Sequence, residues 1–151
     1  MSDQGGAAPL INGSCLCGAV KYTLAGGYAM TVLCHCDSCR KFTGSSFGAN
    51  SLVDKKNLTV LDPQKKMQIY RAATAESGGS LARSFCSVCG SSLFVASEKN
   101  PGQVAVTSGT MDNAQGVEGV EGKLWTPQLE VYCKRKAKWY TNEGTHQMYM
   151  M

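Results

Sequence analysis

Seven cysteines of the 151-residue chain fall into three short groups whose spacing suits metal binding. The groups are CLC (15–17), CHCDSC (34–39) and CSVC (86–89). In an extended strand, residues two apart face the same side, so a C-x-C pair can hold one ion. A C-x-x-C pair bends the backbone into a knuckle, and thiolates at about 2.3 Å favour tetrahedral zinc. The cysteines therefore predict zinc binding.

Seven thiolates divide into a set of four and a set of three. Four close a structural zinc site, whereas three leave a position open to water or to a substrate, as catalysis requires. Spacing alone does not settle the grouping. The C-x-x-C pairs 36/39 and 86/89 would make a zinc ribbon and leave Cys15, Cys17 and Cys34 for the second site.

Two further residues would close the second site and make both sites structural. His35 lies between two cysteines in chain that should be extended, so its side chain is expected to face away from the metal. Cys133 alternates with Leu129 and Val131, which favours a buried core thiol. We assign no metal-binding or catalytic role to His146.

Apolar and polar residues alternate along several short runs, which predicts a mostly β domain of small antiparallel sheets. The runs lie at 20–24, 67–69, 104–106 and 129–133. One short helical turn is expected after the CHCDSC motif, with Asp37 as N-cap and Gly44 as the C-terminal stop.

The segment GSSFG (44–48) fits the G-x-S-x-G pattern of serine hydrolases. That motif needs a preceding strand, a following helix and a partner histidine. Here a metal knuckle precedes it, and the chain has two histidines. The sequence therefore argues against a serine hydrolase.

Charge and hydropathy exclude several other classes. The net charge of +4 comes from one basic stretch at 134–138, which is expected to be a solvated strand and not a nucleic-acid site. No apolar run reaches the roughly 18 residues of a membrane span, and no signal peptide is evident. We expect a cytoplasmic protein, where eight cysteines favour metal binding over disulfides.

One zinc-binding domain is expected at residues 11–142, after a flexible tail at 1–10 and before a C-terminal extension at 143–151. The Gly-rich stretch 116–122 is expected to be a surface loop.

Five motifs together resemble the glutathione-dependent formaldehyde-activating enzyme family, which also includes centromere protein V. They are GSCLCGAVKY (13–22), CHCDSCRKFTGSSFGAN (34–50), FCSVCGSSLF (85–94), PGQVAVTSGTMDN (101–113) and PQLEVYCKRKAKW (127–139). The resemblance implies a fold of stacked small sheets, similar to methionine sulfoxide reductase B and translationally controlled tumour protein.

The resemblance also implies which cysteines share a metal. Four would hold a structural zinc: Cys15, Cys17, Cys86 and Cys89. Three would hold a second, open and catalytic zinc: Cys34, Cys36 and Cys39.

The implied activity joins glutathione to formaldehyde, and its reverse is carbon–sulfur lyase chemistry. Three thiolates on a divalent zinc leave a charge of about −1, which suits activation of a thiol better than polarisation of a carbonyl. Another aldehyde or a glutathione conjugate is an alternative substrate. Arg40, directly after Cys39, is the candidate that meets a glutathione carboxylate.

One departure from the family concerns Glu130, where many members carry a histidine, so the substrate is expected to differ if that histidine serves it. The alternative function is a non-catalytic zinc scaffold, like the centromere branch, or a glutathione carrier. The scaffold would use the basic stretch 134–138 to meet a partner.

Overall fold

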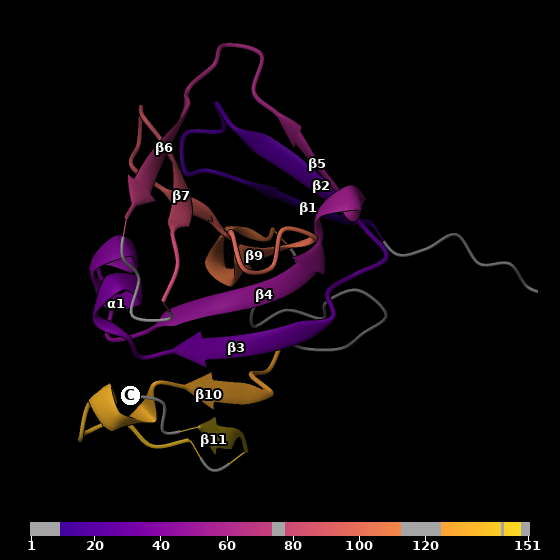
Figure 1. Ribbon diagram of the computed structural model, residues 1–151. Coiled ribbons are helices and arrows are strands. Elements are labelled where there is room, and N and C mark those ends of the chain that lie inside the picture. Colours follow the sequence, from indigo (N-terminus) through magenta and orange to yellow (C-terminus); the bar gives the residue numbers. More distant parts are fainter. Residues whose placement is uncertain (1–9, 74–77, 113–124, 143, 149–151) are drawn as a thin grey trace, which may run out of the picture.

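Two β-sheets form the framework of the protein (Figure 1). The computed structural model describes residues 10–73, 78–112, 125–142 and 144–148. The smaller sheet has the order β1-β2-β5, with bounds Leu10–Ser14, Lys21–Ala25 and Leu58–Leu61. The larger has the order β11-β10-β3-β4-β9-β8-β7-β6. Its bounds are β3 (Met30–Cys34), β4 (Gly48–Asp54), β6 (Met67–Ala72), β7 (Leu81–Cys86), β8 (Ser92–Ser97), β9 (Gln103–Thr107), β10 (Leu129–Val131) and β11 (His146–Met148). The prediction of a mostly β fold is confirmed.

The hydrophobic core joins the smaller sheet to one face of the larger sheet. Tyr22 and Leu24 alternate along β2 and are buried, as their period-two pattern predicts. The Tyr22 ring meets Phe94 of β8 edge-on, with the ring centroids 5.3 Å apart. Val53 of β4 and Val106 of β9 belong to the same core. This core therefore covers one face of the larger sheet and does not extend to the opposite face.

Strand pairing departs from the predicted antiparallel pattern at one place. β10 runs parallel to both of its neighbours, β3 and β11. Parallel neighbours cannot be joined by a hairpin, and most of the chain lies between β3 and β10. The local alternation at 129–131 predicts the strand, but it carries no information on direction.

The alternating run at 67–69 forms a strand, β6, but its apolar side chains are not buried in the core. β6 is the last strand of the larger sheet, and Ile69 on it is 48% exposed. With β7 as its single neighbour, β6 lacks the second strand that would help to cover its side chains.

The short helix after the CHCDSC motif is present as α1 (Asp37–Thr43). Its N-cap is Cys36 and not Asp37, because the Cys36 sulfur accepts a hydrogen bond from the Cys39 N–H. Gly44 ends the helix with φ +65°, a left-handed conformation that glycine adopts readily. A helix thus precedes the 44–48 segment and strand β4 follows it, the reverse of the order that a hydrolase elbow needs.

The segment after β10 corrects two predictions. Cys133 is buried, as predicted, but it does not continue the face of Leu129 and Val131. Tyr132 has φ +57°, which ends the strand and starts the 3-10 turn η4 (Cys133–Arg135). The basic stretch is therefore no solvated strand. Arg135 lies 2.7 Å from an Asp37 carboxylate oxygen.

The structure describes part of each predicted outer segment. Leu10 already belongs to β1, and His146–Met148 adds β11 to the larger sheet. The loop predicted at 116–122 lies outside the described residues, as do residues 1–9 of the predicted tail. Among the helices of the described chain, none has the length and apolar character that crossing a membrane requires.

Candidate metal centres and the adjoining cavity

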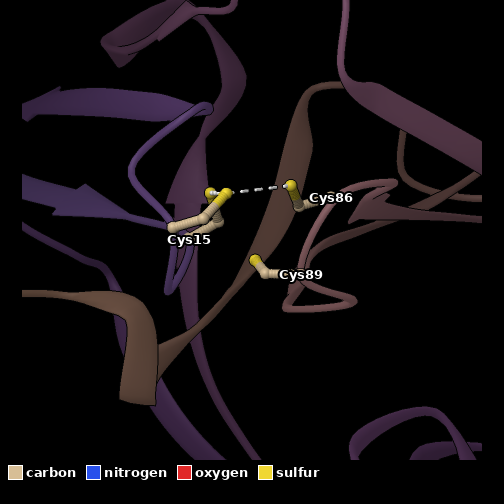
Figure 2. Close-up of side chains that lie close together, drawn as sticks. Cys15, Cys86 and Cys89 are labelled. Atoms are coloured by element: carbon tan, nitrogen blue, oxygen red, sulfur yellow. Dashed lines mark hydrogen bonds between the residues drawn. The ribbon is translucent and has the colours of Figure 1, made fainter.

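Four cysteine sulfurs from two distant turns lie within 4.8 Å of one another. Cys15 and Cys17 come from the turn between β1 and β2, while Cys86 ends β7 and Cys89 lies in the turn between β7 and β8. The labelled side chains of Cys15, Cys86 and Cys89 point toward a common space in Figure 2. The zinc-ribbon grouping is therefore wrong, because Cys86 and Cys89 lie with the first cysteine pair.

The dimensions of this four-cysteine set fit a tetrahedral metal ion. The Cys15 and Cys17 sulfurs are 3.6 Å apart, and those of Cys17 and Cys86 are 3.8 Å apart. Four sulfurs placed tetrahedrally at about 2.3 Å from zinc would be about 3.8 Å apart. The backbone N–H of Val20 donates to the Cys15 sulfur at 3.3 Å. The set suits a closed structural site.

The turn that carries Cys86 and Cys89 is shaped for this purpose. Gly90 has φ +74°, and its N–H donates to the Cys86 carbonyl at 2.8 Å, which closes the knuckle. The Ser91 hydroxyl lies 3.2 Å from the Cys89 sulfur. Hydrogen bonds from the Ser91 side chain and backbone lower the pKa of the Cys89 thiol to about 5. Deprotonation, which metal binding requires, is therefore favoured at Cys89.

The second set contains three sulfurs, also within 4.8 Å of one another. Cys34 is the last residue of β3, Cys36 is the N-cap of α1, and Cys39 lies in the first turn of that helix. Hydrogen bonds from the thiols of Cys34 and Cys39 hold the pKa of Cys36 well below its usual value. The cluster therefore yields its first proton readily, and thiolates are the form that binds zinc.

His35 does not join this set. Its ring is fully buried and turned away from the sulfurs, as the extended chain between two cysteines predicts. Its Nε2 lies 2.8 Å from Oε1 of Glu130, which is also fully buried. Thr145 donates a hydrogen bond to Glu130 Oε2 at 2.6 Å, and Lys136 Nζ lies 3.3 Å from the same oxygen. This buried network fixes the chain between Cys34 and Cys36.

The three sulfurs line a cavity of about 530 Å³. It lies on the face of the larger sheet opposite the core, where alternate residues of neighbouring strands point the same way. The wall is mostly apolar, and its side chains include Met30, Val32, Leu52, Val95, Leu129 and Val131. A reactant at the three-cysteine set would therefore have an apolar space beside it.

Arg83 on β7 is the site residue that the sequence analysis missed. Its side chain lines the cavity, and the residue is 4% exposed. Both terminal nitrogens lie 4.0 Å from the Cys39 sulfur, and the guanidinium stacks over the Phe42 ring at 5.1 Å. The single charged residue of the run 81–86, three residues before Cys86, was the available signal. Its positive charge faces the thiolates.

Two predicted residues lie beside the cavity lining and not within it. Arg40 pairs with Asp37 on α1, and its side chain is 41% exposed. Glu130 faces the opposite side of β10 from Leu129 and Val131, so it does not touch the cavity. A glutamate in place of the family's histidine at position 130 therefore changes no residue of the described cavity lining.

Comparisons with known proteins point in one direction. The family model of the glutathione-dependent formaldehyde-activating enzyme matches residues 10–135. A protein of Halomonas elongata is 30% identical over 105 residues, which is 69% of this chain and 67% of that protein. Proteins of Aspergillus flavus and Aspergillus oryzae are each 35% identical over 82 residues. Those matches span 53% of this chain and 40% of each fungal protein. The curated names assign all three provisionally to the same enzyme family.

The fold has a solved counterpart. The crystal structure of a Rhodobacter sphaeroides protein aligns with a TM-score of 0.56, over 76% of this chain and 99% of that one. The two sequences are 24% identical, so this likeness concerns the fold alone.

Proposed function

Because the chain belongs to the glutathione-dependent formaldehyde-activating enzyme family, we propose that it joins glutathione to an aldehyde at the three-cysteine set. The product is a hemithioacetal, S-(hydroxymethyl)glutathione when the aldehyde is formaldehyde. The reverse reaction is carbon–sulfur lyase chemistry. In this proposal the chain carries about two zinc ions and works in the cytoplasm.

The observation that carries the proposal is the difference between the two cysteine sets. One has four sulfurs at tetrahedral spacing, and the other has three sulfurs beside a cavity of about 530 Å³. A zinc ion held by three thiolates offers one open position and favours loss of the proton from a thiol there. The four-cysteine set would be structural, and Cys34, Cys36 and Cys39 would serve the reaction.

In this proposal Arg83, the one cationic residue in the described lining of the cavity, stabilises negative charge that forms during the reaction. As the thiol sulfur bonds to the carbonyl carbon, the carbonyl electron pair moves to oxygen and leaves an alkoxide, which then takes up a proton. A buried guanidinium beside the sulfurs would stabilise that charge. Arg40, which pairs with Asp37 outside the cavity lining, stays a prediction as a contact for a glutathione carboxylate.

The Arg83 role is tested by Arg83→Gln. Loss of a group that stabilises transition-state charge is expected to lower kcat about 100-fold, with KM little changed. Arg71→Gln, at an exposed position on β6, is the matched control. Zinc content measured on both variants separates loss of the guanidinium from loss of metal. An Arg83→Gln enzyme with normal zinc and normal kcat would contradict the role.

The proposed activity is tested by ¹³C NMR exchange between the aldehyde and its glutathione adduct. The enzyme's contribution is the rate in excess of the spontaneous reaction. Cys34→Ser is expected to abolish that excess, whereas Cys133→Ser, which removes a buried thiol outside both sets, should retain it. An unchanged excess rate in folded Cys34→Ser would contradict a catalytic role for the three-cysteine set. No excess rate in the wild-type protein would favour the scaffold or the glutathione carrier.

A further inference from the structure

The cavity beside the three-cysteine set is much larger than formaldehyde. Formaldehyde has two heavy atoms and is about as large as one or two water molecules, each of about 30 Å³ in the liquid. The cavity of about 530 Å³ falls within the range of about 300–1,000 Å³ that is usual for larger ligands. A one-carbon aldehyde would leave most of this space to water.

The side chains that line the cavity indicate what kind of substrate group fits it. On β3, Met30 and Val32 share a face with Cys34, so the sulfur continues directly into an apolar strip. Strand geometry puts Val32 about 7 Å and Met30 about 13 Å from Cys34 along the strand. Apolar side chains of neighbouring β4 and β10 line the same cavity beside this strip. An apolar chain that starts at the sulfurs would therefore be covered along its length.

Glutathione itself is poorly suited to the same wall. It carries two carboxylates and an ammonium group, and burying such charges without partners is costly. The described lining of the cavity holds four neutral polar residues, Ser38, Asn50, Ser97 and Asn100, but Arg83 is its one charged residue and could pair with one carboxylate at most. The peptide part of glutathione is thus better placed outside the apolar strip, with its sulfur at the cysteines.

We propose that the carbonyl substrate is an aldehyde with an apolar substituent of several carbons, which lies along the strip of Met30 and Val32. This inference rests on the proposed function and names its substrate class. The thiol sulfur of glutathione forms a bond to the aldehyde carbon, and the thiol proton ends on the former carbonyl oxygen. The reaction needs no oxidant, reductant or further reactant.

A binding experiment on the wild-type protein tests the strip without catalysis. S-hexylglutathione imitates the adduct of a six-carbon aldehyde, and S-methylglutathione is its short counterpart. Each fully buried methylene strengthens binding by roughly fourfold. Calorimetry is therefore expected to give S-hexylglutathione an affinity at least about tenfold higher, even with partial burial. Equal affinities would overturn the inference.

The NMR exchange assay then compares hexanal with formaldehyde. Because formaldehyde is intrinsically the more reactive carbonyl, the comparison uses each aldehyde's acceleration over its spontaneous reaction. We expect this acceleration to be at least about tenfold greater for hexanal. Ala105→Phe places a ring in the cavity from β9 and should remove this preference. Ile69→Phe, on the exposed surface of β6 outside the cavity, should keep it.

The possible outcomes separate this inference from the proposed function. Acceleration with formaldehyde but not with hexanal would overturn the inference and leave the proposed function standing. No acceleration with either aldehyde would refute the proposed function, and the inference with it. The calorimetric comparison uses wild-type protein, so the test remains decisive if Ala105→Phe does not fold.

Discussion

Replacing Glu130 by glutamine would test whether the buried network behind the three-cysteine set stabilises the fold. The Glu130 side chain is fully buried and meets three donor side chains, those of His35, Lys136 and Thr145. An ionised carboxylate only accepts hydrogen bonds, so His35 Nε2 carries the hydrogen in this pair. Glutamine keeps the size of the side chain, but it removes the charge and brings an NH₂ group toward one of the donors.

The cost follows from the burial of these groups. Lys136, with a side chain 13% exposed, would lose its charged partner. If the new amide turned its NH₂ toward His35, the ring hydrogen would move to Nδ1, which has no hydrogen-bond partner among the described residues. Breaking a buried charge pair costs about 3–5 kcal/mol, and glutamine retains part of the bonding. We expect Glu130→Gln to lower the free energy of unfolding by about 3 kcal/mol.

The pH dependence gives a second readout. Burial alone would raise the pKa of the Glu130 carboxyl, but the hydrogen bonds from its three donors outweigh burial and lower the pKa below its ordinary value of 4.5. A pKa lowered by folding contributes stability above the unfolded value, and that contribution is lost as the pH falls through the folded value. The difference between wild type and variant should therefore be the same at pH 8 and pH 6.

Urea unfolding of zinc-loaded protein measures this difference. Asp37→Asn is the matched control, because it makes the same change in an exposed carboxylate paired with Arg40 and Arg135. Solvent screens that pair, so little change is expected. Equal stabilities of Glu130→Gln and wild type would show that the buried network does not stabilise the fold. A difference that disappears at pH 6 would contradict a contribution from the ionised carboxylate.

Two further predictions concern packing and metal. Gly13→Ala should cost about 3 kcal/mol, because its Cβ would overlap the buried ring of Tyr22; Gly102→Ala, with open space around it, is the control in the same thermal unfolding experiment. Cys86→Ser should unfold the chain, since metal binding at a structural site supplies folding free energy. Cys34→Ser should leave a folded chain with less zinc, and equal unfolding of both variants by circular dichroism would contradict the division into two kinds of site.

The cysteine spacing predicts metal sites, but it cannot by itself pair them. Cys15 and Cys17 meet Cys86 and Cys89 because the turn after β1 packs against the turn after β7. Such a contact is set by the packing of two sheets, which short motifs do not encode. The resemblance to the family supplied the grouping that local spacing left open.

The cavity and Arg83 could not be predicted for a related reason. Alternation along β3 places Met30, Val32 and Cys34 on one face, and this much is readable from sequence. Whether that face is covered depends on strands far away in the chain. An arginine in a strand is normally exposed, whereas Arg83 is buried, with its guanidinium over the Phe42 ring of α1.

The end of β10 shows the limit of periodicity. The pattern at 129–133 predicts one continuing strand, but the left-handed backbone of Tyr132 ends it at Val131. Non-glycine residues adopt that conformation infrequently, and no neighbouring glycine or proline marks the position. The turn that follows brings Lys136 to Glu130, so a stretch that looks like surface charge contributes to a buried ion pair.

The most direct test of the account is the zinc content of reduced, purified protein before and after dialysis against glutathione. We expect about two zinc ions per chain, one of which becomes labile when glutathione is present. Labile zinc in wild type, absent from Cys34→Ser, would assign the open position to the three-cysteine set. Two zinc ions that glutathione never perturbs would contradict an open site and favour a structural role for both cysteine sets.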